Sequence, residues 1–305
     1  MKAILFLFVL IFFALNTFAQ GCSDAGVCSI GNFNAGHTGY TRKPDHKNEI
    51  SLSYIYGTHG KYERFYQPQL NYRFIKNNKS YLEIRLPFGI AKNKLSRIST
   101  SGIGDMTVTY NSKILLTKKQ RLDYSTGLRI SFSNTDKTDG KNISSYPMTL
   151  QNGLGTTDLL LAVNYDIGKY LSAGAGMQLP LLQYNNNKAI LYPANGASIY
   201  GDGFRRRPDA LLKITGHYQF QKLKINGSVL GIFHLGDDYY NTGSGKYFLR
   251  GSHGTTLNWS IDIAYSIGKR WTIGFIFAEP FKTRAVIPDG LARSRILNPS
   301  VTYKF

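Results

Sequence analysis

No hydrophobic run in this sequence is long enough to cross a membrane as a helix. The longest apolar stretch, residues 4–15, is about a dozen residues long, whereas a spanning helix needs about 20. Cysteine is also scarce, because Cys22 and Cys28 are the only two among 305 residues. Two thiols without a nearby histidine do not suit a metal centre. The sequence therefore excludes a helical membrane protein, and we expect neither a bound metal nor a cofactor.

Acidic residues are few as well, with 18 Asp and Glu against 37 Lys and Arg, so the net charge is +19. In a cytoplasmic protein this excess would suggest a nucleic-acid partner. Here Lys2, the apolar stretch and the small-x-small pattern Thr17-Phe18-Ala19 together predict a secretory signal peptide over residues 1–19. In an exported chain the positive charge indicates an anionic surface such as lipopolysaccharide, an acidic solute, or ordinary solvated turns. We expect no nucleic-acid partner.

Residues 20–47 form a separate segment that is rich in small residues. Its Cys22 and Cys28 lie close together in an exported chain, so they predict a local disulfide. The segment either hangs in the periplasm, which is slightly favoured, or folds into the molecule as a plug. Lipidation of Cys22 is a further alternative, because the small residue Gly21 precedes it.

The remaining chain, residues 48–305, alternates apolar and polar residues with a period of two. Each run of this kind predicts a strand with one apolar and one polar face. Twelve runs lie at 48–58, 65–76, 80–90, 103–116, 120–133, 155–167, 169–184, 207–220, 222–235, 256–267, 269–280 and 294–305. The pattern predicts an all-β protein, namely a transmembrane antiparallel up-and-down β-barrel of about 12 strands.

The connections between these runs alternate in length. Short ones, as at 76–79 and 268–270, alternate with long ones, as at 134–154, 185–206 and 236–255. Outer-membrane barrels have this pattern, with short periplasmic turns and long extracellular loops. The pattern therefore predicts the bacterial outer membrane as the location, with both chain ends in the periplasm and outer-membrane lipid as a partner.

The chain ends with Tyr303 and Phe305 on one face of the last run. This pair resembles the C-terminal assembly signal of bacterial outer-membrane barrels, which makes the barrel-assembly machinery an expected partner. An exposed apolar edge strand would be an aggregation hazard, and closing the sheet removes it. The alternative is a secreted soluble β-sandwich, which would explain neither the alternating connections nor the aromatic terminus.

If the apolar face of each strand contacts lipid, the polar face lines the lumen. That face carries charges of both signs: Arg73, Glu83, Arg85, Asp105, Lys113, Asp123, Arg129, Asp158, Asp166, Lys213, His217, Lys224, His234, Asp262 and Glu279. Opposite charges should pair, because an unpaired buried charge is costly. One interpretation is a structural ion-pair network, and the other is a polar pathway that selects solutes by charge.

The long connections carry further candidate groups. The run Arg205-Arg206-Arg207 predicts contact with the phosphates of lipopolysaccharide. The neighbours Ser252 and His253 are the nearest approach to a hydrolase pair, but adjacent residues of an extended chain seldom point at each other. We therefore name no catalytic residue and do not expect an enzyme.

Three short segments are Leu86-Pro87-Phe88-Gly89, Ser101-Gly102-Ile103-Gly104-Asp105-Met106 running into a strand, and Gly153-Leu154-Gly155-Thr156-Thr157-Asp158. They resemble the outer-membrane family associated with the meta-pathway of phenol degradation. The resemblance covers roughly residues 80–220. It implies a relative of the fatty-acid-type outer-membrane transporters that passes hydrophobic small molecules.

The favoured function is a channel or transporter for small solutes, hydrophobic ones included. The alternative is a structural or surface-interaction barrel whose lumen is filled. An outer-membrane hydrolase is the third hypothesis. Sequence alone does not identify the solute, the oligomeric state or whether the lumen is open.

Overall fold

The computed structural model describes residues 47–77, 79–115, 120–140, 144–192, 198–289 and 294–305. The predicted signal peptide at 1–19 and the predicted Cys22–Cys28 disulfide lie outside the described residues. Within those residues, no helix is sufficiently long and apolar to span a membrane.

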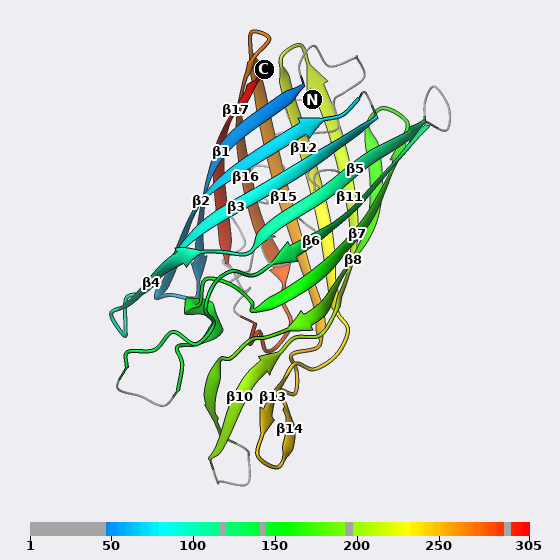
Figure 1. Ribbon diagram of the computed structural model, residues 1–305. Coiled ribbons are helices and arrows are strands. Elements are labelled where there is room, and N and C mark those ends of the chain that lie inside the picture. Colours follow the sequence, from blue (N-terminus) through cyan, green and yellow to red (C-terminus); the bar gives the residue numbers. More distant parts are fainter. Residues whose placement is uncertain (1–46, 78, 116–119, 141–143, 193–197, 290–293) are drawn as a thin grey trace, which may run out of the picture.

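Twelve strands of the described chain close into one antiparallel barrel, as the sequence predicts (Figure 1). They are β1 Asn48–His59, β2 Glu63–Ile75, β3 Ser80–Asn93, β5 Met106–Leu115, β6 Gln120–Ile130, β7 Thr156–Ile167, β8 Leu171–Gln183, β11 Asp209–Phe220, β12 Leu223–His234, β15 Gly254–Ile267, β16 Trp271–Lys282 and β17 Arg295–Lys304. Each strand pairs with its neighbours in this order, and β1 pairs with β17 to complete the ring.

The two ends of the barrel differ. At one end, which we call the terminal end, the N–H of Asn48 donates to Phe305 O at 2.9 Å, so the first and last strands meet there. The turns at this end are short, and three of them contain a residue with positive φ: Gly168, Gln221 and Gly268. The other end, which we call the loop end, carries the long connections (Figure 1).

The loop end holds strands that the alternation pattern does not predict. The predicted loops 185–206 and 236–255 contain β9 Lys188–Leu191, β10 Ile199–Arg205, β13 Tyr239–Thr242 and β14 Gly245–Phe248, which form a second sheet in the order β14-β13-β10-β9. A further strand, β4 Ile98–Ile103, extends the β3 hairpin, and a 3-10 turn, η3, spans Met148–Leu150. Three of these strands, β9, β13 and β14, were missed because strands of four residues are too short to show a period.

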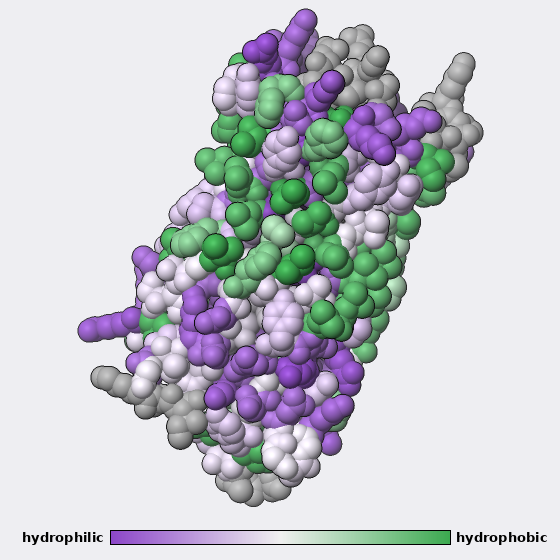
Figure 2. All heavy atoms as spheres, viewed as in Figure 1, coloured by the Kyte–Doolittle hydropathy of each residue, from purple (hydrophilic) through white to green (hydrophobic). Residues whose placement is uncertain are grey.

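The barrel wall has the two faces that the sequence predicts. On β1, for example, Leu52 is 62% exposed while its neighbour Ser53 is 5% exposed. Large exposed apolar side chains recur on the outward face of every barrel strand. They form a belt across the visible face, between two more hydrophilic ends (Figure 2). Such a surface suits a lipid environment, where outward apolar residues need no burial.

Candidate functional site

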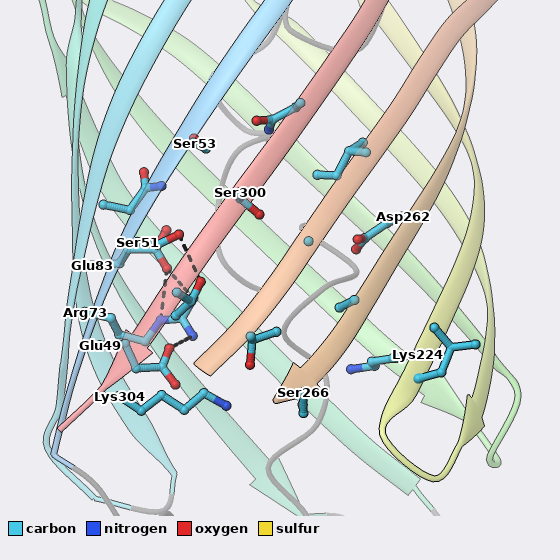
Figure 3. Close-up of a pocket in the computed structure, with 18 of the residues that line it drawn as sticks. Glu49, Ser51, Ser53, Arg73, Glu83, Lys224, Asp262, Ser266, Ser300 and Lys304 are labelled. Carbon is cyan, nitrogen blue, oxygen red and sulfur yellow. Dashed lines mark hydrogen bonds and ion pairs between the residues drawn. The ribbon is translucent and has the colours of Figure 1, made fainter. Parts of the chain in front are cut away.

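A cavity of about 260 Å³ occupies the lumen near the terminal end (Figure 3). It is bounded by β1–β3, β11, β12 and β15–β17, and much of its lining is hydroxyl and amide: Ser51, Ser53, Gln69, Asn71, Ser300 and Thr302. Ligand pockets begin at about 300 Å³, so the space suits a small solute. The alternation of the strands explains the polar lining, because every second residue points inward.

Arg73 is the centre of an ion-pair network on one wall of this cavity. Its guanidinium lies 2.7 Å from Glu49 Oε2 on β1 and 2.7 Å from Glu83 Oε2 on β3. Glu83 also pairs with Arg85, and the Tyr81 ring centre lies 4.5 Å from the Arg73 guanidinium carbon. Two arginines and two carboxylates thereby neutralise each other across three adjacent strands.

A second ion-pair group lies on β5, β6 and β7. Arg121 Nε lies 3.1 Å from Asp123 Oδ2, and Arg121 Nη2 lies 2.7 Å from Asp166 Oδ2. Lys113 stands directly opposite Asp123 in the β5–β6 register, and both residues are buried. These side chains therefore face one another on the polar side of the wall.

A chain of polar side chains crosses from β8 to β15. Ser172 Oγ lies 2.8 Å from His217 Nε2, His217 Nδ1 lies 2.9 Å from Asn226 Oδ1, and Asn226 Nδ2 donates to Asp262 Oδ2 at 3.4 Å. The order resembles nucleophile, base and orienting group. Ser172 is only 2% exposed, however, and β8 is paired on both sides, so its backbone N–H groups are not free to stabilise an oxyanion. The chain therefore does not support a hydrolase.

The segments that carry the family resemblance meet inside the barrel. Asp105 Oδ2 accepts a 3.1 Å hydrogen bond from Leu154 N, although the two residues are 49 apart in sequence. Arg129 Nη2 lies 2.7 Å from Asp158 Oδ2, and Arg129 Nε lies 3.7 Å from Asp105 Oδ2. One arginine thus bridges the aspartates of both segments and ties the β6–β7 loop to the wall.

Glycine is required where these segments touch. Gly104 interrupts the line from β4 to β5, and its N–H donates to Pro87 O at 2.9 Å. A methyl group on Gly153 would lie 2.2 Å from Ser133 Oγ and 2.3 Å from Asp105 Oδ1, closer than any real contact. Because glycine has no Cβ atom, the loop can pack closely against the wall at this point.

A buried charged cluster lies at the loop end of the barrel. We call it the loop latch, and its members are Arg206, Asp209, His234, Asp238, Arg284 and Asp289. Asp289 Oδ2 lies 3.2 Å from Arg206 Nε and 2.6 Å from Arg284 Nη2. His234 lies 2.6 Å from Asp209 and 2.8 Å from Asp238. The latch therefore joins the two wall strands β11 and β12 to three separate connections.

Little space remains at the loop latch. The cavity that five of its members help to line is about 10 Å³, enough for about one water molecule. Burial alone would raise the pKa of Asp289, but Arg284 and Arg206 outweigh it and hold that pKa well below its usual range. The carboxylate therefore stays charged and paired, and the cavity at the loop latch is far smaller than the 260 Å³ cavity near the terminal end.

The loops beyond the latch have their own apolar core. Met148, Leu154, Leu191, Phe204 and Tyr240 are all buried, and the rings of Phe204 and Tyr240 lie 5.4 Å apart. These residues come from the β6–β7 loop, β9, β10 and β13, so one core joins loops that are distant in sequence. The loop end is consequently a folded cap.

The predicted lipopolysaccharide contacts need correction at Arg206. This residue is 2% exposed and held within the loop latch, so it does not present its charge to a lipid surface. Arg205 donates to Asn185 O at 2.8 Å, and the Arg207 guanidinium lies 5.2 Å from the Tyr239 ring centre. One acidic partner of Arg206, Asp209, lies three residues on, but the other, Asp289, lies 83 residues away, and the sequence does not show that the two meet.

Glu279 also departs from its predicted place in the lumen. It stands opposite Trp259 in the β15–β16 register and pairs with Arg295 at 2.5 Å. Arg295 is 58% exposed in its side chain, so the pair lies on the outer face near the rim. The neighbouring Ala278 takes the inward position and is 1% exposed.

No family model and no curated protein matches this sequence. An outer membrane channel from Pseudomonas putida F1 has a similar structure, with a TM-score of 0.60 at 13% identity over 88% of this chain and 98% of that one. The NanC porin has a TM-score of 0.48 at 10% identity, over 85% of this chain and 100% of the porin chain. The toluene transporter TodX of Pseudomonas putida has a TM-score of 0.46 at 12% identity, over 93% of this chain and 95% of the transporter chain. At such identity the likeness shows the fold alone, which is that of an outer-membrane β-barrel.

Proposed function

We propose that this protein is an outer-membrane channel for small solutes, with the loop latch as its closed gate. The observation that carries the proposal is the polar cavity of about 260 Å³ in the lumen, and the paired charges of the loop latch lie at the other end of the barrel. A purely structural barrel has no need of such a space. The proposed location is the bacterial outer membrane, with the terminal end in the periplasm.

The nature of the solute follows from the lining. Hydroxyl, amide and charged side chains dominate the cavity, and such groups favour polar solutes. The family resemblance implies hydrophobic small molecules instead, and its support is the meeting of Asp105, Arg129 and Asp158 around the shared glycine-rich segments. We place the polar solute first, because the cavity itself is polar.

A second candidate function is a structural or surface-interaction barrel with a filled lumen. The specific observation in its favour is the loop latch, where the cavity has a volume of only about 10 Å³. In this case the loop end would bind lipopolysaccharide or another partner through its remaining basic side chains. Tyr303 and Phe305, whose rings stack 5.9 Å apart, are the proposed assembly signal in either case.

Current recordings in planar bilayers distinguish the two functions. We expect residues 20–305, folded in detergent, to show heat-modifiable gel migration and discrete openings. A variant lacking 20–47 is recorded beside it, and conductance only in that variant would make the segment a plug. A folded barrel that stays silent in both forms, and also after the loop latch is broken, would favour the structural function.

A further inference from the structure

The cavity at the terminal end carries more positive than negative charge. Its lining includes five cations, Arg73, Arg85, Lys222, Lys224 and Lys304, against three carboxylates, Glu49, Glu83 and Asp262. The difference is two positive charges. The space is therefore electropositive as well as polar.

The two kinds of cation in this cavity behave differently. Arg73 and Arg85 form ion pairs with Glu49 and Glu83, so these two arginines stabilise the barrel wall. Among the described residues, Lys224 and Lys304 have no side-chain hydrogen bond and no ion pair within 4 Å. The Asp262 carboxylate acts on Lys224 at longer range, but neither ammonium group is held in an ion pair within 4 Å among the described residues.

Lys224 and Lys304 reach the cavity from different parts of the wall. Lys224 projects from β12 and Lys304 from β17, and both point their nitrogens into the space between them, with Ser266 nearby (Figure 3). Lys304 stands opposite Glu49 in the β1–β17 register, but that carboxylate is bound by Arg73 at 2.7 Å. The two lysines therefore converge on an open volume.

We propose that this cavity is a binding site for a small oxyanion, carried by Lys224 and Lys304. Partly buried ammonium groups that lack a close ion pair are unfavourable, and an anion between them would relieve that cost. Ser266 also lines the cavity, and its hydroxyl can donate a hydrogen bond to an oxygen atom of the anion. The ligand would be a small carboxylate or phosphate-type ion, which the volume of about 260 Å³ accommodates.

The inference rests on the proposed channel function and names its solute class. Anions would collect in the electropositive half of the lumen, and cations would be repelled from it. Reversal potentials in a potassium chloride gradient should then show that the wild-type pore prefers chloride over potassium.

The test compares two double variants. K224Q/K304Q removes both ammonium groups from the cavity, whereas K76Q/K269Q removes two exposed lysines that do not line it. We expect the chloride-to-potassium permeability ratio to fall about tenfold in the first variant, because each charge contributes a few-fold at these distances. The ratio should stay near wild type in the second. A cation-selective wild type, or equal ratios in both variants, would overturn the proposal.

Direct binding separates this site from the channel function. Isothermal titration of the detergent-folded barrel with inorganic phosphate, and separately with benzoate, should give saturable heat that K224Q/K304Q abolishes and K76Q/K269Q retains. A response to benzoate alone would assign an organic carboxylate, and a response to phosphate alone an inorganic ion. Binding without any conductance would refute the channel and keep the site. Conductance without binding of either probe would refute the site and keep the channel.

Discussion

Replacing Asp289 with asparagine is expected to open the loop end of the barrel. The substitution keeps the shape of the side chain but leaves Arg206 and Arg284 buried without the carboxylate that both contact. Breaking a buried pair on one side costs about 3–5 kcal/mol, which corresponds to a shift of about 150- to 5000-fold between closed and open loops. Planar-bilayer recordings of D289N should show a large rise in open probability.

The control for this variant lies on the same β16–β17 hairpin. Glu279 pairs with Arg295, but Arg295 is 58% exposed, and such surface pairs contribute about 0–1 kcal/mol. E279Q removes the same charge and should leave gating unchanged. If D289N and E279Q behave alike, the loop latch does not gate the pore.

Mild acidification should not reproduce the effect of D289N. The pKa of Asp289 lies well below its usual value because Arg284 and Arg206 outweigh the effect of burial. A carboxyl group with a depressed pKa stabilises the fold above its unfolded value of about 3.9, and this contribution is lost only as the pH falls through the lower folded value. Asp289 therefore stays charged at pH 5.

Replacing Arg73 with methionine is expected to weaken the whole barrel. Methionine fills much of the same volume, but Glu49 and Glu83 lose the guanidinium that lies 2.7 Å from each, and both are buried. Glu83 keeps Arg85, whereas Glu49 loses its ion pair with Arg73, so we expect a loss of about 3–5 kcal/mol in the free energy of unfolding. Urea titration of the folded, heat-modifiable band should show a clearly lower midpoint.

Two further variants sharpen this experiment. R64M changes the same residue type on the same strand. Within the part of the chain that the structure describes, Arg64 donates only to the backbone carbonyls of Lys61 and Glu63, so R64M should cost under about 1 kcal/mol. R73K keeps the positive charge but loses the planar guanidinium that contacts two carboxylates at once. Its urea midpoint should lie between those of the wild type and R73M. An R73M midpoint equal to that of R64M would contradict a stabilising role for the network.

Much of the barrel could be predicted because its strands repeat one simple pattern. The alternation along 256–267, for example, predicts the strand that the structure places at Gly254–Ile267. The cap over the loop end could not be predicted in this way. Lys188–Leu191 and Tyr239–Thr242 are four residues each, and their pairing through β10 depends on chain segments that are far apart in sequence.

The polar face of each strand was also readable from sequence, but the partners on it were not. Arg73 and Glu83 share a face by period two, yet the contact of Arg73 with Glu49 depends on the register between β1 and β2. Arg206 is harder still, because its partner Asp289 lies 83 residues away. Among the described residues, Lys224 and Lys304 have no ion pair within 4 Å, which sequence does not reveal.

The pairing of β1 with β17 has a consequence for how the molecule is made. Glu49 stands opposite Lys304, so the ring is completed by residues from the two extremes of the described chain. Until the last strand has been synthesised, one side of Asn48–His59 has no partner, and closing so long a loop is entropically costly and slow. Folding must therefore follow synthesis of the whole chain, and the interval before closure is when an unpaired strand is exposed to aggregation.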